Sequence, residues 1–239
     1  MVRDRDAQQY MSTKHSLLIH GSSMSKIWQQ RTKAVYEDPQ IVKGYIGKHS
    51  VAPKMFKVID SFAREINGKQ VLDLGCGPGQ DSYCFSKLGF NVTGMDYSSE
   101  MIKAAQQLQT VNNPPQFIVG DMREIITLFS PNTFDAVWAS ASLLHIPQND
   151  ISVVLNGIHS ITKNDGRVFI AVKQGEQGER VVAESKYGKP MKREFTFWEK
   201  NNLERLLLST GFIIEKSVEQ TQKQNDSTTW LNFFLRVGK

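Results

Sequence analysis

The stretch Val71-Leu-Asp-Leu-Gly-Cys-Gly-Pro-Gly-Gln-Asp81 decides the fold of this 239-residue chain. An apolar strand runs here directly into three glycines at alternate positions, and a helical pattern follows. The glycines are Gly75, Gly77 and Gly79. Because glycine lacks Cβ, the chain can turn tightly off the strand and its amides can approach a ligand closely. Asp73 lies at the tip of this strand and Asp96 ends the next apolar stretch, so the pattern predicts a nucleoside-binding βαβ unit.

The spacing of the glycines indicates which of two kinds of nucleoside cofactor the loop would bind. Dinucleotide-binding loops follow G-x-G-x-x-G and place a pyrophosphate on the helix N-terminus. Here the third glycine comes one residue early, Gln80 follows it, and Asp81 adds a second carboxylate near Asp73. Carboxylates would repel a pyrophosphate, whereas they attract a ligand with a cationic amine and a sulfonium centre.

These residues resemble motif I of the class I S-adenosylmethionine (SAM)-dependent methyltransferases. Three later segments resemble further motifs of that family, in the same order. Residues 94–98 resemble the acidic ribose motif, residues 117–122 the adenine motif, and residues 134–147 motif IV with the segment after it. The resemblance covers about residues 70–173, and the ordered set is far more specific than a lone glycine loop.

The resemblance implies SAM as the cofactor and assigns its contacts. Asp96 would accept hydrogen bonds from the ribose hydroxyls, Asp121 from the adenine amine, and the amide of Met122 would contact the ring. The implied cofactor-binding residues are Tyr45, Asp73, Gly75, Cys76, Gly77, Pro78, Gly79, Asp96, Tyr97, Met101, Asp121, Met122, Ala139 and Leu143. Two alternatives remain open: the glycines form a tight turn without a ligand, or Asp121 only caps the next helix.

Composition limits the class of protein. No apolar run approaches the roughly 18 residues that span a bilayer, and we expect a cytoplasmic protein. Cys76 and Cys84 offer no disulfide framework or zinc spacing, and no carboxylate cluster in residues 140–165 resembles a Mg²⁺ site. We therefore expect no metal. The net charge is +5, and the basic residues flank an acidic centre. The flanks indicate either an anionic substrate or nucleic acid, or ordinary solvated lysines.

The apolar patterns predict an α/β fold: a seven-stranded, Rossmann-like doubly wound sheet with the last strand antiparallel, plus an N-terminal helical lid. Residues 1–30 are expected to form a flexible tail and residues 31–239 a single domain, with the lid over 31–67 and the core over 68–239. Pro53 lies in the first turn of a predicted lid helix. Residues 174–190 are predicted to form a loop, and residues 196–199 a capping box for the next helix.

Methyl transfer from a sulfonium needs a nucleophile held in line with the departing sulfur, and a base only if that nucleophile arrives protonated. His145 is the candidate catalytic residue, as a base or a substrate hydrogen-bonder; alternatively it is a loop histidine satisfied by backbone. Tyr36 and Tyr45 could cover the cofactor from the lid or could pack in the core or at the surface, and Ser98 is predicted to be a helix N-cap. An aromatic run at 195–198 beside Lys192 and Arg193 could line an acceptor pocket or pack in the core.

The predicted function is methyl transfer from SAM to an oxygen, nitrogen or sulfur atom of a small-molecule acceptor, by a monomer or homodimer. Residues 139–142 lack the motif of amino-group DNA methyltransferases and lack a Pro-Cys nucleophile. The alternatives are an RNA or protein methyltransferase that uses the basic flanks, a non-catalytic SAM-binding regulatory subunit, and a nicotinamide dehydrogenase. Salt-sensitive binding of RNA would favour the first of these.

Overall fold

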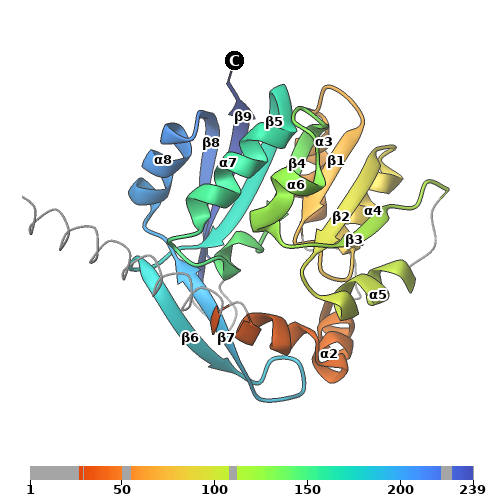
Figure 1. Ribbon diagram of the computed structural model, residues 1–239, viewed down its shortest axis with the longest axis vertical. Coiled ribbons are helices and arrows are strands. Elements are labelled where there is room, and N and C mark those ends of the chain that lie inside the picture. Colours follow the sequence, from red (N-terminus) through yellow and green to blue (C-terminus); the bar gives the residue numbers. More distant parts are fainter. Residues whose placement is uncertain (1–26, 29, 50–54, 108–111, 222–227, 239) are drawn as a thin grey trace, which may run out of the picture.

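A seven-stranded sheet forms the centre of the molecule in a computed structural model that describes residues 27–28, 30–49, 55–107, 112–221 and 228–238. The strand order is β3-β2-β1-β4-β5-β9-β8 (Figure 1). The strands are β1 (Gln70–Leu74), β2 (Asn91–Asp96), β3 (Gln116–Val119), β4 (Phe134–Ser140), β5 (Thr162–Lys173), β8 (Phe212–Thr221) and β9 (Thr229–Val237). The first five are parallel, and β9 runs antiparallel to both of its neighbours. The predicted fold class is confirmed.

Helices cover both faces of this sheet, which explains why its central strands are apolar almost throughout. The helices after the first strand are α4 (Gln80–Lys87), α5 (Ser99–Gln107), α6 (Ile125–Leu128), α7 (Ile151–Ile161) and α8 (Lys200–Ser209). Two short 3₁₀ helices, η1 (Met122–Glu124) and η2 (Leu143–His145), follow β3 and β4.

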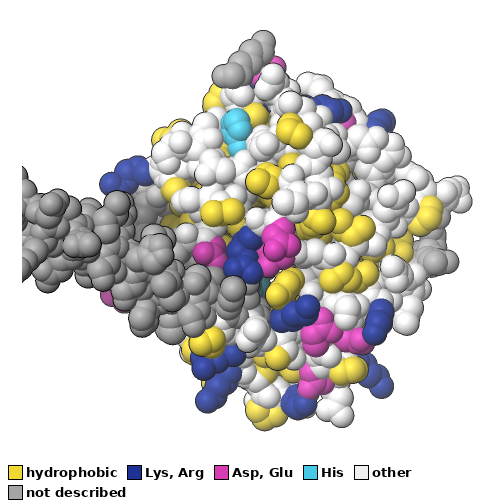
Figure 2. Space-filling model, viewed as in Figure 1, with side chains coloured by type: hydrophobic (Ala, Val, Ile, Leu, Met, Phe, Trp, Pro, Cys, Tyr) yellow, Lys and Arg dark blue, Asp and Glu magenta, His cyan; other side chains and the backbone are white. Residues whose placement is uncertain are grey.

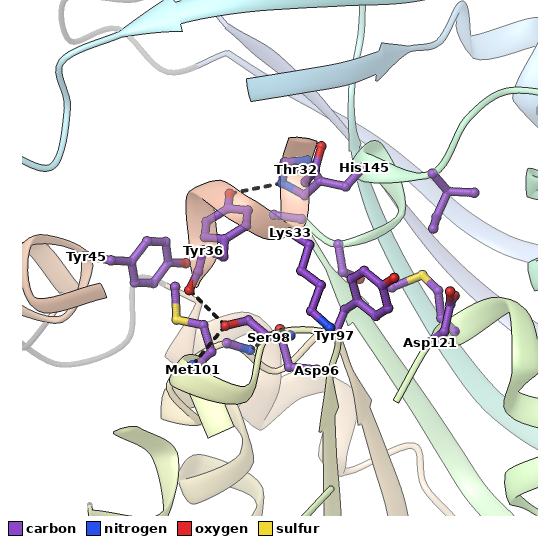
Figure 3. A pocket seen from close by; sticks show the side chains of 16 residues that line it. Thr32, Lys33, Tyr36, Tyr45, Asp96, Tyr97, Ser98, Met101, Asp121 and His145 are labelled. Atoms are coloured by element: carbon purple, nitrogen blue, oxygen red, sulfur yellow. Dashed lines mark hydrogen bonds between the residues drawn. The ribbon is translucent and has the colours of Figure 1, made fainter. Parts of the chain in front are cut away.

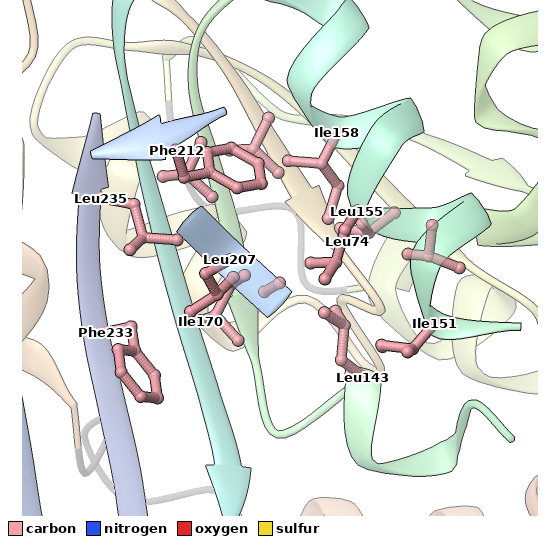
Figure 4. Close-up of a cluster of buried hydrophobic side chains, with 14 of the residues drawn as sticks. Leu74, Leu143, Ile151, Leu155, Ile158, Ile170, Leu207, Phe212, Phe233 and Leu235 are labelled. Atoms are coloured by element: carbon pink, nitrogen blue, oxygen red, sulfur yellow. The ribbon is translucent and has the colours of Figure 1, made fainter. Parts of the chain in front are cut away.

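Successive strand residues point to opposite faces, so each face has its own hydrophobic core. On one face Leu72 and Leu74 pack with α7 and α8, and this core also takes in β9 (Figure 4). On the other face Val71 packs with α4 and with α3 (Phe56–Ala63). There the ring of Trp138 stacks on Phe169 with the ring centroids 4.0 Å apart. These two cores hold the carboxyl ends of the parallel strands in fixed positions.

The N-terminal helices lie against the carboxyl end of β2. Residues 30–36 are helical, and α2 (Pro39–His49) follows them. The carbonyl of Tyr36 accepts a hydrogen bond from Ser98 Oγ at 2.8 Å. The carboxylate of Glu37 accepts from the amide and hydroxyl of Ser99 at 2.8 and 3.0 Å. Two contacts therefore tie these helices to the start of α5, where the amide of Met101 also donates to Ser98 Oγ as the predicted N-cap requires.

Residues 178–184 and 191–197 form a hairpin, and the prediction of a loop over 174–190 was wrong. The strands are β6 (Gly178–Glu184) and β7 (Met191–Phe197), which pair antiparallel outside the main sheet. Most of β6 is exposed, so its sequence needs no apolar alternation and gives no strand signal. The predicted capping box was also wrong: Thr196 is buried in β7 and donates to the carbonyl of Ile146 at 2.6 Å.

Parts of the predicted N-terminal organisation lie outside the described residues. Pro53 is one such residue, and so are most positions of the predicted tail over 1–30. Residues 27–28 and 30 are helical, which extends the helical part to the N-terminal side of residue 31. The division into lid and core therefore stays a prediction. Within the described ranges no helix has the length and apolar character that a bilayer crossing requires.

Candidate functional site

A cavity opens where β1, β2 and β4 end and the N-terminal helices cross over them (Figure 3). This is the usual ligand position in open α/β sheets. It contains about 790 Å³ of empty space, including the open space at its mouth. The lining residues are Thr32, Lys33, Tyr36, Tyr45, Gly75, Gly77, Asp96, Tyr97, Ser98, Met101, Asp121, Met122, Ala141, Ser142, His145 and Ile146.

The glycine loop needs glycine for two different reasons. Gly75 has φ +77°, and a Cβ on it would lie 2.2 Å from the Cβ of Ser142. Gly77 has φ +52°, and a Cβ there would meet nothing within 4 Å. The amides of Gly75 and Cys76 both donate to the carbonyl of Met95, at 2.7 and 3.0 Å, which fixes the loop on β2. The loop thus offers bare backbone to the cavity.

Asp96 holds its carboxylate at the wall of the cavity through two backbone amides. Its Oδ2 accepts from the amide of Gly77 at 2.9 Å, and its Oδ1 accepts from the amide of Ser98 at 2.8 Å. A carboxylate has about four acceptor positions, so each oxygen keeps one for a ligand. Burial raises the pKa of Asp96 above its usual value, although these hydrogen bonds oppose the shift. Beside it, Lys33 Nζ lies 4.4 Å above the ring of Tyr97.

Asp73 and Asp81 form an acidic pair below the glycine loop and do not line the cavity. Asp73 is buried and accepts from Ser82 Oγ at 2.6 Å, whereas Asp81 accepts from Trp138 Nε1 at 2.8 Å. Burial raises the pKa of Asp73, and the charge of Asp81 raises it further. Burial likewise raises the pKa of the Cys76 thiol. The two carboxyl groups can act on a ligand in the cavity electrostatically, but they do not line the cavity and so make no direct contact with it.

Asp121 lines the cavity and also caps η1. Its carboxylate accepts from the amide of Arg123 at 2.9 Å and from the Arg123 guanidinium at 2.7 Å. The same guanidinium reaches Asp150 at 3.2 Å. Asp121 therefore does cap η1, as the alternative interpretation expected, and it also lies at the cavity wall. Its contact with an adenine amine stays a prediction.

His145 has both ring nitrogens engaged. Its Nδ1 lies 3.0 Å from the carbonyl of Glu194, which can only accept, so Nδ1 carries the proton. Its Nε2 must then accept from the Tyr36 hydroxyl, which lies 3.1 Å away. That hydroxyl accepts in turn from Arg193 Nη1 at 2.8 Å. Burial lowers the pKa of His145 to about 3, and the charge of Arg193 lowers it further, so the imidazole stays neutral.

The charged residue in this chain of hydrogen bonds, Arg193, comes from the β6–β7 hairpin. Arg193 is buried on β7, pairs with Glu184 of β6, and lies 4.9 Å from the ring centroid of Phe195. Glu194 pairs with Arg31 of the N-terminal helices at 3.3 Å. Segments more than a hundred residues apart in sequence are thus joined at one wall of the cavity.

Nine of the fifteen predicted site residues line the cavity and six do not. The nine are Tyr45, Gly75, Gly77, Asp96, Tyr97, Met101, Asp121, Met122 and His145. Cys76, Pro78 and Gly79 lie in the glycine loop but away from the cavity wall, as Asp73 does below it. Ala139 and Leu143 do not line the cavity either, because their side chains are buried in the core that packs on α7; their contact with a cofactor stays a prediction.

Seven lining residues were absent from the predicted set. They are Thr32, Lys33, Tyr36, Ser98, Ala141, Ser142 and Ile146. Tyr36 and Ser98 carried a signal, as a possible lid aromatic and as an N-cap. Ala141 and Ser142 follow β4 directly, so a strand-end argument could have included them. Nothing in the sequence pointed to Thr32 or Lys33, because they come from a helix whose position depends on tertiary packing.

One face of the molecule carries charges of both signs. On the face shown in Figure 2, basic and acidic side chains lie next to one another near the centre and in the lower part.

Among the described residues, no group of three His, Cys, Asp or Glu side chains is arranged to hold a metal ion. The fold and the cavity together define a nucleoside-binding α/β protein whose site is acidic at the glycine loop.

Comparison with known proteins identifies the family that the central part of the chain matches. Residues 72–170 match the family described as "Methyltransferase domain". A ubiquinone biosynthesis O-methyltransferase of Haemophilus ducreyi is 32% identical over 127 residues, which are 52% of this chain and 53% of that protein. Residues 72–170 thus carry a methyltransferase domain, in agreement with the resemblance of the motifs to the class I SAM-dependent methyltransferases. It spans about half the length of the curated relatives it matches.

Solved structures with low sequence identity share the fold. A SAM-dependent methyltransferase from Methanosarcina mazei has a TM-score of 0.64 at 18% identity, covering 76% of this chain and 97% of that one. A 1,6-didemethyltoxoflavin-N1-methyltransferase from Burkholderia thailandensis, with bound 1,6-didemethyltoxoflavin and S-adenosylhomocysteine, has a TM-score of 0.59 at 19% identity. That match covers 84% of this chain and 88% of the other.

Proposed function

We propose that this chain transfers a methyl group from SAM to a small-molecule acceptor. The observation that carries the proposal is the carboxylate of Asp96, held at the cavity wall by the amides of Gly77 and Ser98 with acceptor positions to spare. A ribose presents two adjacent hydroxyl donors, which match these two oxygens. The buried acidic pair below the loop favours a ligand that carries positive charge there.

SAM supplies an activated methyl group, so the protein has to position the acceptor and exclude water. The N-terminal helices cover the cavity, and their contacts with Ser98 and Ser99 hold them close to the predicted ribose position. The relatives' names support a small acceptor, since they include a ubiquinone biosynthesis O-methyltransferase. The methylated atom remains oxygen, nitrogen or sulfur in this proposal.

His145 serves in this proposal as a positioning residue. Both of its ring nitrogens are engaged, and its lowered pKa makes it a poor proton acceptor. It orients the hydroxyl of Tyr36, which also receives a hydrogen bond from Arg193 and faces the cavity. An acceptor with an ionised or lone-pair nucleophile needs no protein base, which is consistent with this arrangement.

Titration calorimetry with SAM and its product S-adenosylhomocysteine tests the proposal. We expect both to bind with dissociation constants of about 1–100 μM, a range of affinity common for enzyme ligands. Asp96→Ala should weaken binding by about 1 kcal/mol or more, which is at least about fivefold. Asp165→Ala is the matched control, because Asp165 lies on the surface and pairs with Arg236. If Asp96→Ala and the wild type bind S-adenosylhomocysteine with equal affinity, Asp96 does not bind the ribose.

The alternatives give different outcomes. An RNA methyltransferase would bind RNA with an affinity that falls steeply with salt. A regulatory subunit would bind SAM and show no turnover with a metabolite extract and labelled methyl donor, whereas our proposal expects a labelled small molecule. Preferential binding of NAD would contradict the family-based proposal altogether.

A further inference from the structure

The hydroxyl of Tyr36 has one hydrogen-bonding position that the described residues leave open. Its proton goes to Nε2 of His145, because Nδ1 of that ring donates to the carbonyl of Glu194 and Nε2 can therefore only accept. One lone pair of the oxygen accepts from Nη1 of Arg193 at 2.8 Å. A hydroxyl oxygen has one proton and two lone pairs, so a second lone pair remains. Tyr36 lines the cavity, and this lone pair is the position that a ligand there can use.

Contacts from several parts of the chain hold this hydroxyl in one orientation. The carbonyl of Tyr36 accepts from Ser98 Oγ at 2.8 Å, and its ring meets the ring of His145 edge-on with the centroids 5.4 Å apart (Figure 3). The carbonyl of His145 accepts from Nε1 of Trp28 at 3.3 Å, and Arg193 is 5% exposed. Turning the Tyr36 proton toward the cavity would leave Nε2 of His145 buried without a donor, which is unfavourable. We therefore expect Tyr36 to accept a hydrogen bond from a ligand and not to donate one.

The elements that carry Tyr36 and His145 differ from those that carry the predicted nucleoside position. The proposed function places the nucleoside of the methyl donor at Asp96, which ends β2, and at Asp121, which follows β3. The hydroxyl of Tyr36 comes from the N-terminal helices and meets His145 in η2, after β4. Because the nucleoside does not need these two side chains, we assign their part of the cavity to the methyl acceptor.

Charge narrows the kind of donor group that Tyr36 can bind. An ammonium group on the Tyr36 oxygen would lie close to the guanidinium of Arg193, which contacts the same oxygen, and the two cations would repel each other. The carboxylate of Glu184 pairs with Arg193 and offsets part of its charge. Lys173 adds a second cation, because its Nζ lies 4.1 Å above the ring of Phe195, which Arg193 approaches to 4.9 Å. An uncharged hydroxyl or N–H group donates to Tyr36 without this repulsion.

The geometry also separates the bound group from the methylated atom. If the bound group lost its proton during the reaction, that proton would have to pass through the Tyr36 oxygen to Nε2 of His145. Burial lowers the pKa of His145 to about 3, so the imidazole does not keep a proton near pH 7. We infer that Tyr36 binds the methyl acceptor through an uncharged hydroxyl or N–H group that is separate from the methylated atom, an inference that rests on the proposed function.

The tautomer of His145 tests the first step before the acceptor is known. In protein labelled with ¹⁵N-histidine at pH 7, the signals that disappear in His145→Gln belong to His145. They should show a protonated Nδ1 and an unprotonated Nε2. With the opposite tautomer, Nε2 would donate to Tyr36, whose own proton would be free to point at the ligand. That tautomer, or an imidazolium at pH 7, would overturn the inference.

A cycle of changes in the enzyme and in the acceptor tests the contact itself. The acceptor is the molecule that wild-type protein labels in a metabolite extract with a labelled methyl donor. Each uncharged hydroxyl or N–H group besides the methylated atom is replaced in turn by hydrogen. For one of these analogues the wild-type kcat/KM should fall by about tenfold, because a buried hydrogen bond is lost. Tyr36→Phe should distinguish that analogue from the natural acceptor by less than about twofold. A variant that is slower but keeps the tenfold difference would overturn the inference.

Tyr83→Phe is the matched control for the loss of a tyrosine hydroxyl. The hydroxyl of Tyr83 donates to the carbonyl of Ala105 at 3.1 Å, and the residue is buried and does not line the cavity. This variant should keep the tenfold difference between the two acceptors. If Tyr36→Phe does not fold, the tautomer of His145 and the chemical structure of the labelled acceptor still decide.

The results also separate this inference from the proposed function. If the labelled acceptor has no uncharged hydroxyl or N–H group besides the methylated atom, the inference fails and the proposed function stands. If folded wild-type protein binds no S-adenosylhomocysteine, or binds it and labels no small molecule, the proposed function fails and the inference fails with it.

Discussion

Gly75→Ala should destabilise the protein through two effects that can be separated. The first is backbone strain: Gly75 has φ +77°, and placing an L-residue in the left-handed region costs about 1–2 kcal/mol. The second is overlap, because the new Cβ would lie 2.2 Å from the Cβ of Ser142. Carbon atoms in contact prefer about 3.5–4.0 Å, and overpacking of this kind costs about 1–3 kcal/mol.

A double-mutant cycle with Ser142→Gly isolates the second effect. Gly75→Ala alone should lower the free energy of unfolding by about 2–5 kcal/mol, the sum of the two effects. In the Ser142→Gly background the overlapping Cβ is absent, so only the strain of about 1–2 kcal/mol should remain. The predicted coupling energy between the two positions is therefore about 1–3 kcal/mol.

Urea unfolding followed by circular dichroism and tryptophan fluorescence measures each corner of the cycle. Trp138 reports on the core, since it is fully buried between α3, α4 and β5. The slopes of the four transitions should agree, so that the midpoints compare directly. Additivity of the two substitutions within about 0.5 kcal/mol would refute the contact between Gly75 and Ser142.

Three further substitutions test other features. His145→Gln should reduce the loss of stability at acid pH. The pKa of His145 is about 3 in the folded protein, below its unfolded value, so the unfolded state binds the proton first as pH falls. The free energy of unfolding of the wild type should therefore fall by up to about 1.4 kcal/mol per pH unit between pH 6.5 and 3. The difference between the two urea-unfolding profiles measures this, and parallel profiles would contradict a neutral His145. Asp135→Ala should cost about 2–4 kcal/mol in the same assay, because the amides of Lys69 and Gln70 lose their acceptor; a cost below about 0.5 kcal/mol would contradict it. Glu37→Gln should speed hydrogen exchange over residues 30–37, since the contact with Ser99 weakens, and unchanged exchange there would count against this contact.

The part of the cavity formed by the glycine loop and Asp96 could be predicted because it depends on local sequence. A strand, a glycine turn and an acidic strand end each have a short-range signal, and parallel strands bring their carboxyl ends together. Asp96, Gly75 and Gly77 reach the cavity for this reason. Ala139 does not reach the cavity with its side chain, because successive strand residues point to opposite faces and this one points into the core.

The opposite wall of the cavity could not be predicted in the same way. Arg193 reaches Tyr36 only because β6 and β7 pair outside the main sheet. The mostly exposed β6 lacks period-two hydrophobicity, so the sequence gives no signal for this pairing. The tautomer of His145 also depends on tertiary contacts. A backbone carbonyl and a hydroxyl group, both far away in sequence, determine which ring nitrogen holds the proton. Residue type indicated a possible base, whereas the neighbours of His145 support the positioning role proposed above.

The β6–β7 hairpin is a separate two-stranded unit between β5 and α8, and its exchange would leave the seven-stranded sheet intact. Grafting the corresponding segment from another member of the family would therefore alter one wall of the cavity while Asp96 and the glycine loop keep their places. Because the two parts of the cavity wall come from separate units of the fold, the molecule is a convenient scaffold for recombination: hairpins can be exchanged and ligand preferences compared while the rest of the cavity stays unchanged.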